Sequence, residues 1–489
     1  MKSRILSCAI VLTLLLGRTL SAVYGDSATW STNPVTNDWN TATNWTPPTV
    51  PNSSADTATF DVSNTTNVSL SARTTIGEII FNPGASAFTI TAPDNTSHAL
   101  NIVGAGLSNQ SRIEQALVAP VFGEFSLGLP TLIFKGNALA GDLITLTASL
   151  GGGIRFQDNS GADHATIVGA EQSFIVFANT SNAGSSVITA SGTDQSSSYG
   201  SEVDFIANSD AANAILIAEG GTGGGAGSRI YFTDDSSGGL AQVQIFGNGT
   251  LLVDHAEPGV TIGSLEGDGI VSLGLGALSI GSNGRDTVFS GVIQDFVFTH
   301  TLIKVGDGAL HLKGASTYTG GATIEGGQLL AENSTGSALG TGAVQVNSGT
   351  IGGSGIIASG VTIGTGAFLA PAAGTNVQST LTIQSPLTFN ADATYTYSFR
   401  AKRNRARTDM VIANGVTINS GATLALSGQT RGALSQGLVL TLISNTSANP
   451  INGTFANLLD GGIVTVNGDN FQASYSGGDG NDLTLTVVP

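Results

Sequence analysis

The chain has 489 residues, of which 67 are glycine, 40% are hydrophobic and only 10% are charged. That hydrophobic content excludes a disordered protein, which needs low hydrophobicity and high charge. The formal net charge of −17 at pH 7 argues against nucleic acid or an anionic membrane surface as a partner. Cys8 is the only cysteine, so we expect no disulfide and no thiolate metal site.

Residues 1–25 resemble a secretory signal peptide. A basic start precedes the apolar run Ile10–Leu16, and small residues follow it. The run is too short to span a membrane, which takes about 20 residues, and no later segment is long and apolar enough. We therefore expect cleavage after Ala22 or Gly25, and a secreted, extracellular or cell-surface protein with no membrane span once the signal is removed.

Residues 26–100 contain all three tryptophans, Trp30, Trp39 and Trp45. A solenoid needs its first coil covered, because an open end exposes apolar core and unpaired strand edges. We therefore interpret this region as an N-terminal β cap. The alternative is a carbohydrate-binding module in which the three tryptophan rings contact a sugar.

Between residues 101 and 395 a β-rich unit recurs, in which phenylalanine is followed four residues later by serine and then by an isoleucine-containing strand. The four copies contain Phe156 and Ser160, Phe177 and Ser181, Phe205 and Ser209, and Phe232 and Ser236. A strand-sized unit recurring at roughly 20–30 residues is typical of a solenoid. Because a nucleophile is needed only once, we interpret the four serines as a stacked ladder whose hydroxyls bond to the backbone at a turn.

One cluster of carboxylates in these units could serve as the acidic groups of a polysaccharide-degrading enzyme. A polysaccharide lyase or hydrolase needs acidic groups that converge in one groove. Asp158 and Asp234 each follow a repeat phenylalanine by two residues, and Asp235 and Arg229 lie near the second. The equivalent residues of the two intervening units are Asn and Ala, and Asx residues are ordinary turn formers. A carbohydrate-active enzyme therefore stays an alternative, and we assign no catalytic residue.

Residues 318–383 have a different, glycine-rich style. Ile324, Val346, Ile363 and Ile383 are expected to point inward. Their spacing matches one coil of a parallel β-helix, which consists of three short strands joined by turns. Glycine suits the corners, where the backbone needs positive φ.

A family resemblance follows from two neighbouring stretches. Leu302–Leu310, together with Tyr318–Ile324 and the residues up to Gly349, resembles the autotransporter-associated β-strand repeat. That repeat occurs in passenger regions of bacterial autotransporter-like proteins. The resemblance implies a right-handed parallel β-helix, export, and a surface or extracellular role, and it brings no catalytic residues with it.

The region 396–489 is expected to be a C-terminal β-rich cap. Near its end the sequence indicates strand, turn and strand, with Asn467-Gly468 as the hairpin turn. The run Gly477–Asp482 is similar to a calcium-binding nonapeptide, but it occurs once, and successive copies normally share each ion. We interpret it as a second hairpin turn.

The most anomalous run of this acidic chain begins at residue 400. Its basic residues are Arg400, Lys402, Arg403, Arg405 and Arg407. We expect an exposed loop that either is simply solvated or contacts an anionic polysaccharide or the acidic body of a neighbouring copy.

Together these observations predict an all-β chain, a right-handed parallel β-helix of the pectin-lyase-like kind with β caps at both ends. The expected function is that of a non-catalytic structural or adhesin-like passenger protein, without cofactor or metal. Its expected partners are extracellular polysaccharide, the cell envelope or other copies of itself.

Overall fold

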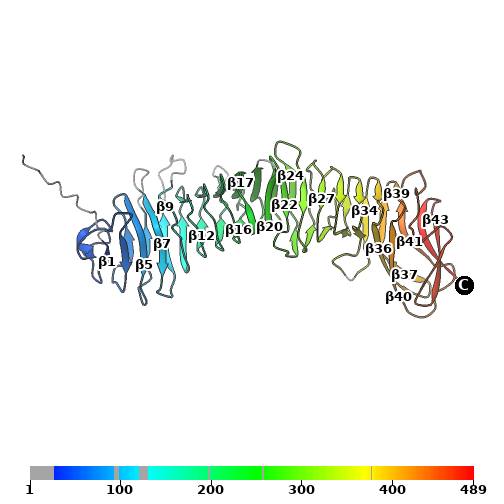
Figure 1. Cartoon of the computed structure of the whole chain (residues 1–489), viewed down its shortest axis with the longest axis horizontal. Helices are drawn as coiled ribbons and strands as arrows, with labels where there is room; N and C mark the ends of the chain where they lie inside the picture. Colours follow the sequence, from blue (N-terminus) through cyan, green and yellow to red (C-terminus); the bar gives the residue numbers. More distant parts are fainter. Residues whose placement is uncertain (1–26, 93–98, 121–129, 196–198, 256–257, 376) are drawn as a thin grey trace, which may run out of the picture.

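The computed structural model describes residues 27–92, 99–120, 130–195, 199–255, 258–375 and 377–489. The expected signal peptide, residues 1–25, lies outside these ranges. The described residues form one elongated rod of short β-strands stacked along its long axis (Figure 1). Within the described part of the chain, the one helical turn is η1 (Ala42–Asn44), and no helix there is long and apolar enough to cross a membrane.

Each coil of the chain visits three faces of the rod in turn, and strands on one face pair in parallel with those of the next coil. The prediction of a parallel β-helix is therefore confirmed. Face one contains β1 (Ala28–Trp30), β3 (Thr57–Phe60), β5 (Thr74–Phe81), β7 (Leu100–Asn109), β9 (Leu132–Phe134), β11 (Gly153–Phe156), β13 (Phe174–Phe177), β15 (Glu202–Phe205), β17 (Arg229–Asp234), β19 (Thr250–His255), β21 (Ile270–Leu273), β24 (Val292–Asp295), β31 (Ile356–Ile357), β34 (Thr380–Ile383), β38 (Met410–Ala413) and β41 (Val439–Asn445). Backbone hydrogen bonds through residues 316–318 and 337–338 join β24 to β31.

Face three is lined by strands along almost the whole rod. It contains β4 (Asn67–Ser69), β6 (Thr89–Thr91), β8 (Gln115–Ala119), β10 (Ile144–Ala148), β12 (Thr166–Gly169), β14 (Val187–Ala190), β16 (Ile215–Ala218), β18 (Gly238–Ile245), the end of β20 (Gly259–Gly267), β23 (Thr287–Phe289), β26 (Ala309–Leu312), β28 (Gln328–Ala331), β30 (Thr350–Gly353), β33 (Phe368–Ala370), β36 (Thr394–Lys402) and β40 (Thr423–Thr430).

Face two changes character halfway along the rod. In the first half it is a column of single-residue parallel bridges that runs from Gly106 to Ser237. From the start of β20 it becomes a ladder of full strands. These are β22 (Ala277–Ile280), β25 (Leu302–Lys304), β27 (Ala322–Ile324), β29 (Val344–Val346), β32 (Val361–Ile363), β35 (Leu387–Phe389) and β39 (Val416–Ile418). The widening of face two is the structural basis of the two repeat styles in the sequence.

Antiparallel strands occur at the two ends. At the start, β2 (Trp45–Thr46) pairs with β1. Near the other end, β36 turns back into β37 (Arg405–Thr408), and β42 (Ile463–Val466), β43 (Asp469–Gly477) and β44 (Asp482–Val488) complete a sheet with β41. The predicted hairpin at Asn467-Gly468 is confirmed, since it joins β42 to β43 with φ of 52° and 88°.

The boundaries expected at residues 100 and 395 do not coincide with breaks in the ladders. Parallel pairing already joins β1, β3 and β5, and β36 continues face three without interruption. One apolar core runs from Ala28 to Val487. The parts expected to be caps thus share the core of the rod.

The phenylalanines of the repeat stack on one another along face one. Their ring centroids lie 4.7–4.9 Å apart with interplanar angles of 4–13°, and all the rings are buried. The stack has a fifth member, Phe134, which the sequence pattern missed because Ala138 stands where the other units have serine. Parallel pairing in register places each ring on the preceding one.

The serine ladder is confirmed only in its first half. Ser160 Oγ donates to the carbonyl oxygen of Phe134, and Ser181 Oγ to that of Phe156, both at 3.2 Å. The buried hydroxyls of Ser209 and Ser236 have no hydrogen-bond partner among the described residues.

All four residues expected to point inward are buried, but they do not all lie on the same face of the rod. Ile324, Val346 and Ile363 pair with one another on face two, but the next member of that row is Phe389. Ile383 is also buried, but it lies on face one, where it pairs with Ile357. Ile383 lies outside the row because the coil after Ile363 is longer than the coils before it.

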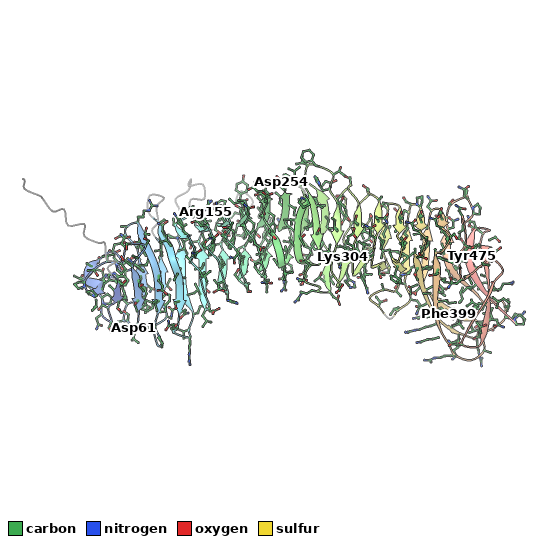
Figure 2. The ribbon with its side chains drawn as sticks, in the orientation of Figure 1. Asp61, Arg155, Asp254, Lys304, Phe399 and Tyr475 are labelled. Carbon is green, nitrogen blue, oxygen red and sulfur yellow. The ribbon has the colours of Figure 1, made fainter. Side chains whose placement is uncertain are left out.

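A lysine occupies an inward position in one of these rows. Lys304 lies in register between Ile280 and Ile324 and is only 1% exposed, midway along the rod (Figure 2). Its ammonium donates to the carbonyl oxygens of Val305 (2.6 Å), Gly306 (3.0 Å) and Gly326 (3.4 Å). Burial lowers the pKa of Lys304 to about 8, against the opposing effect of nearby Asp307 and Asp286.

Phe177→Ala should destabilise the rod by about 3–5 kcal/mol, because it leaves a cavity in the middle of the stack. Hydrogen exchange of the flanking coils together with thermal unfolding would measure the loss. Phe246→Ala is the matched control, since that ring is 43% exposed and should cost little. Equal losses in the two variants would contradict a stabilising role for the stack.

Lys304 should make the rod more stable as the pH rises from about 8 to about 10.5. In that window the folded state has released a proton that the unfolded state still holds, so folding is favoured by up to about 3 kcal/mol. Thermal melting across this range, in the wild type and in Lys304→Met, would test this. Lys313→Met, at a half-exposed lysine, should keep the rise, and a rise that persisted in Lys304→Met would contradict the assignment.

Candidate functional site

The three tryptophans do not form a sugar-binding surface. Trp30, Trp39 and Trp45 are 1%, 0% and 2% exposed, and their rings pack around Phe60 with centroid distances of 5.7–6.1 Å. Each indole N–H donates to a backbone carbonyl, those of Thr65, Pro51 and Trp39 respectively. With both ring faces and the N–H groups engaged inside the protein, none is free for a ligand. The carbohydrate-binding module built on these rings is thus contradicted.

The repeat aspartates belong to a column of turns. The residue two after each stacked phenylalanine has positive φ, from 55° to 64°, whether it is Gly136, Asp158, Asn179, Ala207 or Asp234. The two aspartates of this column accept backbone N–H groups of the preceding coil: Asp158 Oδ2 from Gly136 (3.1 Å), and Asp234 Oδ2 from Ala207 (3.0 Å). The aspartates therefore serve as turn formers that also tie neighbouring coils together.

This geometry does not make a catalytic pair of Asp158 and Asp234. The two lie three coils apart, which corresponds to about 14 Å at the spacing of parallel strands. Glycosidase carboxylates are separated by about 5–10 Å. The candidate face of Asp158, Asp234 and Asp235 is therefore not brought together as a two-carboxylate site.

A different acidic cluster lies on the outer side of face one. Glu202 forms an ion pair with Arg229 at 3.3 Å, and Tyr231 Oη donates to Asp254 Oδ2 at 3.3 Å. Asp204 pairs in register with Tyr231, and its burial, together with the charge of Glu202, raises its pKa to about 7. Sequence reasoning missed Asp204, although Glu202 and Asp204 at i and i+2 of a strand necessarily share a face.

A small cluster of possible metal ligands lies on the surface. His164 Nδ1 is 3.1 Å from Asp142 Oδ1 and 2.9 Å from Asp163 Oδ1. The side chains of His164 and Asp142 are 60% and 73% exposed, and exposed groups of this kind are common on protein surfaces without a metal ion. The calcium-like run Gly477–Asp482 forms a hairpin turn as expected, and Asp482 Oδ1 accepts the backbone N–H of Asn445.

The basic run is a β-hairpin rather than a loop. Arg400 lies opposite Arg407, and Lys402 lies opposite Arg405. Because side chains alternate along a strand, these four cations share one side of the β36–β37 hairpin, and Ala401 and Ala406 occupy the other. Ala401 is buried, so the hairpin rests its alanine side on the protein and turns its charged side outward. The hairpin lies near the C-terminal end of the rod (Figure 1).

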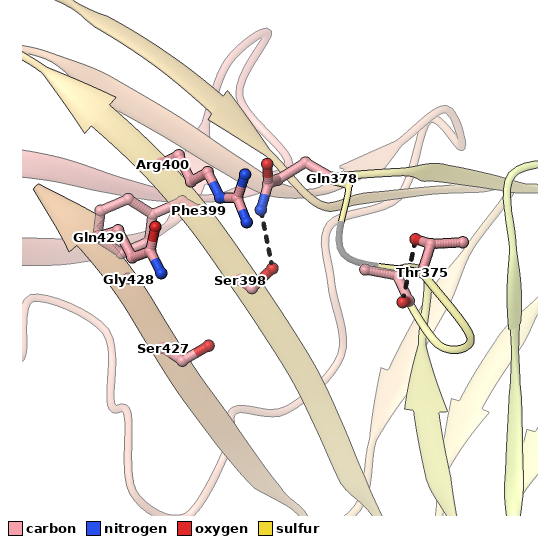
Figure 3. A pocket seen from close by; sticks show the side chains of 9 residues that line it. Thr375, Gln378, Ser398, Phe399, Arg400, Ser427, Gly428 and Gln429 are labelled. Carbon is pink, nitrogen blue, oxygen red and sulfur yellow. Dashed lines mark hydrogen bonds between the residues drawn. The ribbon is translucent and has the colours of Figure 1, made fainter.

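Two hollows adjoin this cationic side. The larger, of about 1070 Å³, is a groove that follows both sides of the hairpin, since Ala401 and Ala406 line it as well as the cations. Its other walls include Gln429 and Arg431 of the β40 edge, and Met410, Leu438 and Val439. The smaller, of about 270 Å³, is lined by Thr375, Gln378, Ser398, Ser427 and Gln429. Arg400 lines both, and Figure 3 shows its guanidinium directed toward Gln378. This pair of hollows is the candidate functional site.

Comparison with known proteins supports the expected repeat. The family model of the passenger-associated-transport-repeat matches residues 302–331, which run from the first residue of β25 to the last of β28. The resemblance to passenger repeats of autotransporter-like proteins is confirmed for this segment. No curated protein matches the chain.

The solved structures that match include one with a distant similarity. The Hap adhesin of Haemophilus influenzae aligns with 10% sequence identity and a TM-score of 0.30, over 88% of this chain and 59% of that one. The chain therefore spans less than two thirds of the length of that adhesin.

Asp204→Asn should stabilise the rod at neutral pH by about 1–3 kcal/mol. In the wild type the folded state holds a proton on Asp204 up to about pH 7 that the unfolded state releases near pH 4, so stability falls as the pH rises through this window. The variant should lack this fall. Thermal melting between pH 4 and pH 8 would measure it, with Asp235→Asn as an exposed control, and equal pH profiles of wild type and Asp204→Asn would refute the effect.

Proposed function

We propose that the chain is exported by its N-terminal signal and acts as a secreted or surface-exposed, non-catalytic passenger protein of structural or adhesin-like function. The observation that carries the proposal is a passenger transport repeat built into an uninterrupted three-faced rod. A rigid rod presents long outer faces, on which shallow contacts can act together with high effective concentration.

The non-catalytic part of the proposal is supported by the roles of the carboxylates. The repeat aspartates accept backbone N–H groups at turns, which gives these carboxylates a structural role that needs no catalysis. The two hollows at the hairpin contain cations, hydroxyls and carboxamides. Such side chains suit binding, while a glycosidase would need a pair of carboxyl groups there.

The alternative of a carbohydrate-active enzyme has one specific observation in its favour. Asp204 has a pKa raised to about 7 by burial and by Glu202, which is the kind of shift that a general acid needs. It lies beside the Glu202–Arg229 ion pair on an outer face of the rod. This cluster is the place where activity should be sought.

Residues 27–489 should release no reducing ends from neutral or acidic polysaccharides, and Asp204→Asn and Asp234→Ala should behave like the wild type. A reducing-end assay on purified protein measures this. Release by the wild type that disappears in either variant would overturn the non-catalytic proposal.

Export and surface exposure need a separate measurement. In cells that express the full chain, external protease should digest it without lysis, and deletion of residues 1–25 should make it resistant. Complete protection of the full chain in intact cells, with no protein in the medium, would contradict the proposed location.

A further inference from the structure

We propose that the cationic side of the β36–β37 hairpin, with the two hollows beside it, binds an acidic polysaccharide, a polymer that carries carboxylate or sulfate groups on its sugars. The inference deepens the proposed function, on which its biological meaning rests, by naming the site and the chemical class of the ligand.

The arrangement of the charges is the first step. Arg400 faces Arg407 and Lys402 faces Arg405 across the two strands, and like charges directly opposite one another destabilise a strand pair. Arg431 extends the same charged surface from the end of β40, where its backbone N–H bonds to Ala401 O. Among the described residues, none of these five side chains forms an ion pair within the protein. In the free protein the repulsion among these cations is therefore not compensated, and a bound polyanion would relieve it.

The local acidic groups do not neutralise this surface. Asp409 is the nearest carboxylate along the chain, but it is 1% exposed, and its oxygens accept the backbone N–H groups of Ser379 and Ser398 at 3.0 and 2.8 Å. It also accepts the hydroxyl of Ser398 at 2.7 Å. Asp409 therefore orients Ser398 in the smaller hollow and leaves the arginines free for a ligand.

The shape of the site suits an extended chain molecule. Cations two residues apart along a strand are separated by roughly 6–7 Å, and those on adjacent strands by about 5 Å. The groove beside them has a volume of about 1070 Å³, and Met410, Leu438 and Val439 contribute apolar side chains to its lining. A linear polymer with a charge on each or every second sugar can lie along such a row and contact several cations together.

The smaller hollow decides between a polysaccharide and another protein. Its lining of Ser427, Gln429 and Gln378 offers a hydroxyl and carboxamides, which can donate and accept hydrogen bonds (Figure 3). The hydroxyls of Ser398 and Thr375 also line it, but they already bond to Asp409 and to the carbonyl oxygen of Val377. Sugar hydroxyls need both roles. Arg400, at the junction of the two hollows, can bind a carboxylate or sulfate through two parallel N–H bonds. The acidic body of a second copy would pair with the cations but would leave the hydroxyl-lined hollow unused.

The test compares matched ligands and matched variants. A fluorescently labelled oligogalacturonate, its methyl ester and a heparin-derived oligosaccharide are titrated with residues 27–489 in the wild type and in Arg405→Gln/Arg407→Gln. The methyl ester keeps the sugar chain and removes its charge. The control variant, Arg73→Gln/Arg285→Gln, removes the same charge from two other exposed arginines. Sedimentation velocity of each protein without ligand measures self-association.

We expect the wild type to bind oligogalacturonate, the heparin-derived oligosaccharide or both, with an affinity that falls with added salt. If oligogalacturonate binds, its methyl ester should bind at least tenfold more weakly. The hairpin variant should lose at least tenfold in affinity, and the control variant should lose little. Because the substitutions relieve a like-charge repulsion, the hairpin variant should melt no lower than the wild type, so that lost binding cannot be attributed to unfolding.

Three results would overturn the inference. The first is that neither acidic ligand binds, and the second is that the two double variants lose the same affinity. The third is self-association of the wild type that the hairpin substitutions abolish, in the absence of ligand binding. That result would assign the surface to a second copy. Surface exposure in the protease experiment is measured independently. A protein that binds the ligand but stays inside the cell would therefore refute the proposed location alone.

Discussion

The parallel register between successive coils is the constraint on which the rest of this structure depends. It places each residue directly against its equivalent one coil away, so one chemical choice is repeated along the rod. Phe156 lies on Phe134 with a centroid distance of 4.7 Å, and Asp158 bonds to the backbone of Gly136. A column of turns with positive φ follows from the same register, because every coil must turn at the same place to keep its strands paired. Gly136 fits this column without strain, and Asp158 and Asp234 offset part of the strain with the hydrogen bonds of their side chains, which Ala207 in the same column does not make.

The widening of face two explains how one fold accommodates two sequence styles. In the first half of the rod a coil crosses face two in a single bridged residue, so the sequence shows two strand patterns per coil and a compact turn. From β20 onward face two holds a full strand, and the passenger repeat at residues 302–331 begins on such a strand, β25. Lys304 then lies inside a row of aliphatic residues. It is tolerated there because its ammonium group donates hydrogen bonds to three carbonyl oxygens at one corner. A buried charge without such partners would be strongly unfavourable.

The sequence allowed the coil architecture to be predicted, because period-2 alternation and a repeated Phe–Ser spacing report directly on stacked strands. Features that depend on the exact length of a coil were harder to predict. Ile383 has the right residue type but lies on face one, since spacing alone does not reveal an extra segment within a coil. The sequence favoured a cap over a sugar surface for the three tryptophans, and their packing against Phe60 in the folded protein decides between the two. Asp204 was missed because its pKa depends on burial, which is a property of the folded face.

The basic hairpin shows why an exposed loop and an exposed strand pair differ in what they can do. A solvated loop would let five cations move apart and would leave no fixed pattern for a ligand. Pairing of β36 with both β37 and β40 instead holds Arg400 between Arg407 and Gln429. Ala401 and Phe399 anchor the other side of the strand in the core. The apolar anchor holds the cations together against their mutual repulsion, and a surface organised in this way needs little further ordering when an anionic chain binds to it.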